Sequence, residues 1–187
     1  MTQGTTQQEI FCTFCHKIKR GPVAKLLDFF ADQTADSDVG AIHLLFQSNG
    51  GDTNQGVVLF NYFRALPIDL HIYNAGGIVA SAALTAFIGA KYRHASTHAM
   101  FVFHKANTIM QFPMTAAQLR EVAHITEIDE KRIVNIFKSV VQMPPEKWSA
   151  YETTSYVPIT AQDAQQYGLI TDVREFHPPF GSRVFNI

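Results

Sequence analysis

Short apolar runs alternate with amphipathic stretches along most of the chain. Residues 9–17 (EIFCTFCHK) alternate and are rich in aromatic and apolar side chains, which predicts a strand. The near-continuous apolar run 41–47 (AIHLLFQ) predicts a second strand, one buried on both faces. Between them, after Pro22, apolar residues recur at the spacing of a helix: Val23, Leu26, Leu27 and Phe30.

The same alternation continues through the middle and the end of the chain. We expect helices over 53–65 and 80–90, and strands over 69–75 and 99–106. Thr160 and Asp163 cap a last short helix that Gly168 ends, and LITDV (169–173) is predicted to be a closing strand. Strands that alternate with helices predict an α/β fold with a mainly parallel sheet.

One predicted helix is much longer than the others. It runs from Thr115 to about Gln142 and opens with Thr115 and Gln118 at the spacing of a capping box. At 1.5 Å per residue it would reach roughly 40 Å, which exceeds the width of a small domain. Its second half (RIVNIFKSVV) is apolar on more than one stripe. One packed face does not require this, so we expect a partner subunit against the helix.

Composition narrows the classes of function. The 187 residues are 47% hydrophobic and 17% charged, as in a globular protein, and the length favours one domain. A net charge of −1 offers no basic field for nucleic acid. No apolar run is long enough to span a membrane, and the polar N-terminus resembles no secretory signal. With two cysteines, a reducing cytoplasm is the expected location.

The segment Cys12-Thr13-Phe14-Cys15-His16 fits the C-x-x-C-H pattern of covalent haem attachment. In an alternating strand, however, positions i and i+3 point to opposite faces, so the two thiols would not hold one ligand. There is no second cysteine pair for zinc. We therefore expect ordinary strand cysteines, with no cofactor and no metal.

Residues 74–87 (NAGGIVASAALTAF) place Ser81 after a glycine turn and before an apolar helix. Amides at a helix start point outward and can receive an oxyanion, so a serine there could be a nucleophile. The alternative is a small residue that allows close packing. A second glycine turn (SNGGD, 48–52) follows the buried strand over 41–47. His104 lies at the end of the strand predicted over 99–106, where it could be a general base or a core histidine.

Taken in this order, the segments resemble the proteolytic subunit of the Clp protease (the ClpP family). The matching motifs are the turn Ser48-Asn49-Gly50-Gly51, the segment from Gly77 to Ser81, and the segment from Arg93 through Ala99 to His104. Weaker similarity continues through MPPEKW and ITAQDAQQYGLITDV, so the resemblance covers most of the chain.

The resemblance implies a serine peptidase of the crotonase-like fold, a spiral of strand–helix units with a protruding handle helix. Ser81 would be the nucleophile, His104 the general base, and the amides of Gly51 and Ala82 the oxyanion hole. It also implies a homo-oligomeric ring, possibly stacked through the 115–142 helix, that acts on peptides. The single ClpP-like domain would have a head of about 1–104 and 160–187 and a handle of about 105–155.

The chain departs from the family at the third member of the triad. Counting from the flanking motifs places Tyr156 or Ser155 where the family has an aspartate, and the nearest acid is Glu152. Any of these, or water, could orient His104. The segment after the histidine (KANTIMQFPM) lacks the family's glycines, which changes how a peptide would pair with it. MTQGTTQQ has no clear counterpart of the family's axial gate, which argues against docking of a Clp-type ATPase.

Three functions remain open on the sequence. The first is a ClpP-like serine peptidase. The second is a catalytically impaired ring subunit with a structural or regulatory role, which the missing aspartate favours. The third is a crotonase-type acyl-CoA enzyme, but it leaves Ser81 unexplained, and Asp52 is the one acid beside either glycine turn.

Overall fold

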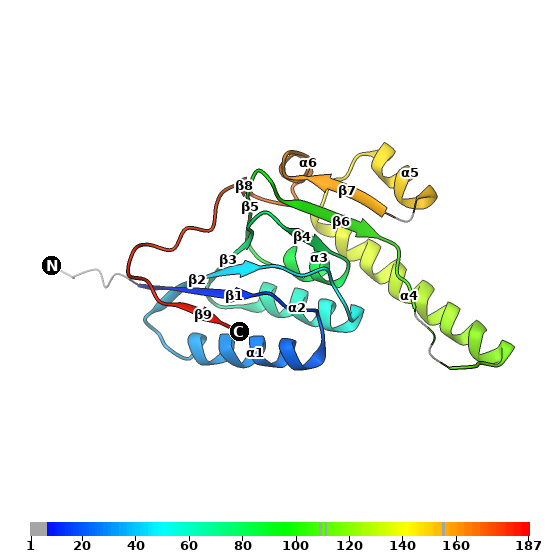
Figure 1. Cartoon of the computed structure of the whole chain (residues 1–187), viewed down its shortest axis with the longest axis horizontal. Helices are drawn as coiled ribbons and strands as arrows, with labels where there is room; N and C mark the ends of the chain where they lie inside the picture. The colour runs from blue at the N-terminus through cyan, green and yellow to red at the C-terminus, as the bar shows by residue number, and fades with distance from the viewer. Residues whose placement is uncertain (1–6, 109, 111, 155) are drawn as a thin grey trace.

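The computed structural model describes residues 7–108, 110, 112–154 and 156–187 (Figure 1). Two sheets organise these residues. The larger is entirely parallel and has the strand order β8-β5-β3-β2-β1-β9. Its strands are β1 (Gln8–Phe14), β2 (Val39–Phe46), β3 (Asp69–Asn74), β5 (Tyr92–Ala95), β8 (Asp172–Val173) and β9 (Val184–Asn186).

Two helices cover one face of this sheet. They are α1 (Arg20–Thr34) and α2 (Thr53–Ala65), which lie beneath β1, β2 and β3 in Figure 1. Each buries an apolar stripe against the strands: Val23, Leu26 and Phe30 from α1, and Leu59, Phe60 and Phe63 from α2. Asp52 caps α2 by accepting a hydrogen bond from the Gln55 amide. The sheet and these helices enclose one continuous hydrophobic core.

The smaller sheet has the order β4-β6-β7. β4 pairs with β6 in parallel, and β6 pairs with β7 in antiparallel orientation. The short helix α3 leaves the end of β4 and packs against α2. The elements of this part are β4 (Ile78–Ala80), α3 (Ala82–Phe87), β6 (Met100–His104), α5 (Pro145–Thr153), β7 (Tyr156–Thr160) and α6 (Ala161–Gln166).

The long helix α4 (Ala116–Val140) projects away from both sheets (Figure 1). Its capping box is present: the Gln118 amide donates to Thr115 Oγ1, and the Thr115 amide donates to Gln118 Oε1. The apolar residues of its second half pack at least partly against the chain's own core, with Phe137 stacked on Phe103 at 4.2 Å. The exposed apolar side chains lie in the first half: Leu119, Ile125 and Ile128.

The mainly parallel α/β fold predicted from the sequence is confirmed, with differences at several boundaries. The helix expected over 53–65 is α2, but the one expected over 80–90 shrinks to α3 because residues 78–80 pair with β6. The first strand ends at Phe14, so Cys12 lies buried inside it and Cys15 is exposed beyond it. Burial raises the pKa of the Cys12 thiol to about 12.

Candidate active site

Ser81 lies at the sharp junction between β4 and α3. Its φ of 58° is the one positive value among the non-glycine residues that the structure describes. Such a conformation costs on the order of 1–3 kcal/mol and persists where surrounding contacts fix it. Here the Ser81 amide donates to Val102 O, and its carbonyl accepts from the Leu84 and Thr85 amides. The side chain itself makes no capping hydrogen bond, so its hydroxyl is left for another partner.

The glycine turn after β2 lies directly against Ser81. A Cβ atom on Gly50 would lie 2.6 Å from the Cβ of Ser81, and one on Gly51 would lie 2.2 Å from the main-chain oxygen of Ile18. Both glycines have positive φ, 96° and 153°. This close approach therefore requires glycine at both positions.

The predicted oxyanion hole consists of the main-chain amides of Gly51 and Ala82. Ile18 forms hydrogen bonds with Gly50 O and with the Asp52 amide, a bridge that leaves the Gly51 amide between them unused. Ala82 is the first residue of α3, so its amide has no acceptor within the helix. Neither predicted donor therefore forms a hydrogen bond with a neighbouring main-chain carbonyl that the structure describes. One donor lies in the glycine turn and the other directly follows Ser81.

His104 ends β6, the strand that pairs with β4. Ser81 and His104 line one narrow cavity. Its other lining residues are Thr53, Ala82, Thr85, Phe103, Ala106, Glu130, Ile133 and Tyr151. The cavity is about 20 Å³, room for about one water molecule. The structure therefore brings the predicted nucleophile and base to one place, with space between neighbouring walls for a small group only.

The partner of His104 is one that the sequence did not indicate. His104 Nδ1 lies 2.7 Å from the main-chain oxygen of Lys105. Glu152, the nearest acid in the sequence, instead contacts the Lys105 ammonium group, with Oε2 to Nζ at 3.4 Å. Tyr156 stands opposite His104 in the β6–β7 ladder, and their ring centroids are 5.2 Å apart. Ser155 lies outside the described residues.

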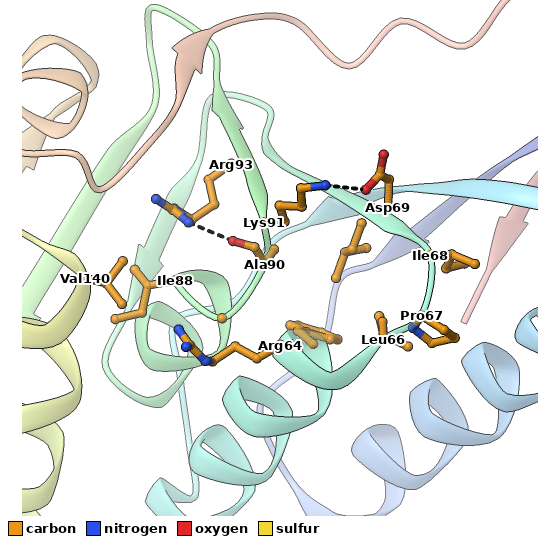
Figure 2. Close-up of a pocket in the computed structure, with 13 residues that line it drawn as sticks. Arg64, Leu66, Pro67, Ile68, Asp69, Ile88, Ala90, Lys91, Arg93 and Val140 are labelled. Carbon is orange, nitrogen blue, oxygen red and sulfur yellow. Dashed lines mark hydrogen bonds and ion pairs between the residues drawn. The ribbon is translucent and has the colours of Figure 1, made fainter.

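A much larger cavity of about 500 Å³ opens elsewhere, between the end of α2 and the start of β5 (Figure 2). Its charged side chains are largely engaged already. Lys91 pairs with Asp69 at 2.9 Å, and the Arg93 guanidinium donates to the main-chain oxygens of Ala90, Gly168 and Leu169. Neither Ser81 nor His104 reaches this cavity, so its size does not make it the better candidate site.

A cluster of three histidines lies on the six-stranded sheet, away from His104. His43, His71 and His94 sit near the middle of β2, β3 and β5, and their rings stack. His71 Nδ1 is 3.0 Å from His94 Nε2, and His94 Nδ1 contacts the Asp172 carboxylate. We call these three residues the histidine ladder. Sequence reasoning missed it because only the strand register brings positions 43, 71 and 94 together.

Burial governs the ladder's titration. It lowers the pKa of His71 to about 4, with the neighbouring His43 and His94 adding to the effect. It also lowers the pKa of His43 and His94, partly against the pull of Glu9 and Asp172 respectively. Over the part of the chain that the structure describes, no group of three or more acidic, histidine or cysteine side chains has the geometry to hold a metal ion. The ladder is therefore a neutral, packed network.

The chain is similar to known proteins in sequence and in fold. The family model described as Clp protease matches residues 13–177. The chain belongs to the Clp protease family. Over 135 residues it is 25% identical to the ATP-dependent Clp protease proteolytic subunit 2 of Pseudomonas aeruginosa. That match covers 71% of this chain and 65% of the relative, so the chain spans about two thirds of that protein's length.

A solved structure supports the fold. A ClpP1 point mutant from Listeria monocytogenes superposes with a TM-score of 0.71, covering 92% of this chain and 93% of that one at 16% identity. The fold is thus the ClpP and crotonase-like α/β architecture, with α4 as the protruding helix. Within the described residues, none of the helices combines the length and the apolar character needed to cross a membrane.

Proposed function

We propose that this protein is a serine peptidase that hydrolyses peptides or unfolded segments inside a ring of identical subunits. Ser81 is the nucleophile and His104 the general base. The observation that carries the proposal is that Ser81 and His104 line one cavity with Ala82, whose amide directly follows Ser81 and has no acceptor within α3. Membership of the Clp protease family supports the same reaction.

In this mechanism Ser81 Oγ attacks the carbonyl carbon of the scissile peptide bond while its proton passes to His104 Nε2. The amides of Gly51 and Ala82 donate to the oxyanion that forms. As the C–N bond breaks, the imidazolium returns the proton to the leaving amine, and an acyl ester remains on Ser81. Water activated by His104 then hydrolyses the ester and restores both groups.

A peptide substrate has a restricted place to bind. β6 is the central strand of its sheet, with β4 on one edge and β7 on the other. β4 pairs with β6 only up to Val102, so we propose that an added peptide strand pairs with the chain beyond His104. That segment carries no glycine, so side chains line the path of the substrate.

Self-association follows from the surface of α4. Leu119, Ile125 and Ile128 are each at least half exposed on the first half of the helix. A projecting helix with such side chains is stabilised when a second copy covers them. We propose that α4 joins subunits of stacked rings and that peptides are cleaved without a dedicated ATPase. The Pseudomonas relative is named as ATP-dependent, and testing hydrolysis with and without ATP addresses this difference.

The second candidate is a ring subunit with impaired catalysis. Two observations favour it: no acid side chain contacts His104 among the described residues, and the cavity beside Ser81 is narrow. Both candidates share the fold and the ring, so only chemistry at Ser81 separates them.

The deciding experiment is labelling with a fluorophosphonate probe, followed by intact-mass spectrometry. We expect a single adduct on the natural chain and none on Ser81→Ala or His104→Ala. Ser96→Ala is the control, because Ser96 lies outside the site, is buried, and has a hydroxyl without a hydrogen-bond partner. Equal labelling of Ser81→Ala contradicts the proposal, and no labelling of any variant favours the impaired ring subunit.

A further inference from the structure

The hydrogen bond of His104 fixes which ring nitrogen carries the proton. Nδ1 lies 2.7 Å from the main-chain oxygen of Lys105. A carbonyl oxygen only accepts hydrogen bonds, so Nδ1 is the donor and the neutral ring keeps its lone pair on Nε2. This tautomer is the one that a serine–histidine pair requires, and in a complete triad a carboxylate selects it.

The acids near His104 are engaged elsewhere. Glu152 Oε2 lies 3.4 Å from Lys105 Nζ, which also donates to the main-chain oxygen of Glu152 at 3.3 Å. Glu130 lines the cavity but faces Tyr151, whose pKa is raised first by burial and then by that carboxylate. Among the residues that the structure describes, no carboxylate forms an ion pair with His104.

Helix α5 holds Lys105 in place. The Lys105 ammonium group contacts both the carboxylate and the main chain of Glu152, and it lies 5.6 Å from the ring centroid of Tyr151. Tyr151 is itself buried and stacks on Phe103, the residue before His104. The stacking of Tyr151 on Phe103 holds the chain before His104, and the contacts of the Lys105 side chain link the residue after it to α5.

We infer that the main-chain carbonyl of Lys105 replaces the triad carboxylate as the group that orients His104, and that Tyr156 marks the position from which a carboxylate would increase activity. The inference rests on the proposed peptidase function. A carbonyl holds the ring in the correct tautomer, but it carries no net charge. It therefore stabilises the imidazolium of the transition state less than a carboxylate does, and the natural chain is a slow peptidase.

The register of the small sheet makes Tyr156 the position to change. Tyr156 is directly opposite His104 on the antiparallel strand β7. Opposed residues in such a pair have Cβ atoms about 4.5–5.5 Å apart, so a short carboxylate at 156 reaches the imidazole. Tyr156 is 59% exposed, and its replacement opens no cavity in the core.

The first test compares the kinetics of Tyr156→Asp and Tyr156→Asn on a fluorogenic peptide. We expect the aspartate variant to raise kcat at least about 10-fold with little change in KM, and to move the acid limb of the pH–rate profile to higher pH. The asparagine variant has the same shape without the charge and should stay within about threefold of the natural chain. An aspartate variant no faster than the asparagine variant overturns the inference.

The second test measures the tautomer directly and needs no activity. In protein labelled with ¹⁵N-histidine, the ring signals of His104 are assigned by their loss in His104→Gln. We expect the Nδ1–H form in the natural chain. The Nε2–H form, in protein that the fluorophosphonate still labels, overturns this inference and leaves the peptidase proposal standing. Failure of labelling overturns the peptidase proposal, and with it any catalytic role of the carbonyl.

Discussion

The chain holds histidine in two contrasting settings. His104 stands at the end of a strand, lines a cavity with Ser81, and is hydrogen-bonded to a main-chain carbonyl. His43, His71 and His94 lie within strands of the larger sheet, stacked on one another and bonded to other side chains. The ladder has more partners, and burial lowers the pKa of its histidines, yet among the described residues it shares no cavity with a nucleophile.

The ladder is covered by the C-terminal part of the chain. Phe176 packs edge-on against Phe11 and Tyr73, which belong to the same aromatic face. Asp172 accepts from His94 Nδ1, so His94 Nε2 accepts from His71 Nδ1, while His43 joins the ladder by stacking on His71. Its neutral rings bind the sheet together. In this molecule the shifted pKa values identify a buried histidine network. The candidate site is identified instead by a cavity that a histidine shares with a serine.

The largest expected effect is on the rate of peptide hydrolysis, and it distinguishes His104 from the histidine ladder. We expect His104→Gln to lower kcat for peptide hydrolysis by about 10³–10⁴-fold, since the general base is lost. His71→Phe should keep kcat within about threefold, because a phenyl ring retains the stacking on His43 and Tyr92. Steady-state kinetics on one fluorogenic peptide measures both. A comparable loss in the two variants would show that the ladder contributes to catalysis.

The next effect concerns the backbone support of Ser81. A Cβ atom added to Gly56 of α2 would lie 2.5 Å from the main-chain oxygen of Ala82, the first residue of α3. We therefore expect Gly56→Ala to lower the free energy of unfolding by about 2–3 kcal/mol and to slow fluorophosphonate labelling. Urea denaturation measures the first effect and the rate of adduct formation the second.

Gly21→Ala is the matched control for this variant. Gly21 also lies in a helix, α1, but an added Cβ there meets no atom within 4 Å. We expect this change to raise the free energy of unfolding by about 0.5 kcal/mol, as alanine is the better helix former. An equally stable Gly56→Ala protein would mean that α2 and α3 do not depend on their close approach.

Much of this architecture follows from pattern alone. Short apolar runs predict buried parallel strands, and the run 41–47 corresponds to β2 and the helix over 53–65 to α2. The strands that the pattern did not predict form by pairing with residues distant in sequence. β4 has three residues and exists through its pairing with β6, and β7 contains Pro158, which a strand tolerates at a sheet edge.

The candidate site divides in the same way. The glycine turns, Ser81 and His104 are visible in the sequence because side-chain types at fixed spacing mark them. The orienting group of His104 is a main-chain carbonyl, which every residue possesses, so no residue type marks it. The sequence left Glu152, Ser155, Tyr156 or water open as the orienting group, and α5 brings the Glu152 carboxylate to the Lys105 side chain instead. A sequence can show that an acid is missing, but it cannot show that a backbone group stands in its place.

The smallest effect is the contribution of the ladder to acid sensitivity. The pKa of each ladder histidine is lower in the folded protein than the ordinary value near 6.5. Below that value the unfolded chain binds more protons, so this stability is fully present above about pH 6.5 and is lost as the pH falls toward 4. The charged groups that face the ladder are Glu9, Asp69, Asp172, Arg93 and Arg174.

His71→Phe removes one titrating ring and keeps the stack. We expect the loss of unfolding free energy between pH 7 and pH 5 to shrink by about 1 kcal/mol, a value reduced for the partial exposure of the ring. Tyr92→Phe also keeps the stack and leaves all three imidazoles in place, so it should preserve the slope of the natural chain. Urea denaturation across this pH range measures both. An unchanged slope in His71→Phe would mean that His71 is protonated as readily in the folded chain as in the unfolded one, and His71 would then contribute nothing to acid sensitivity.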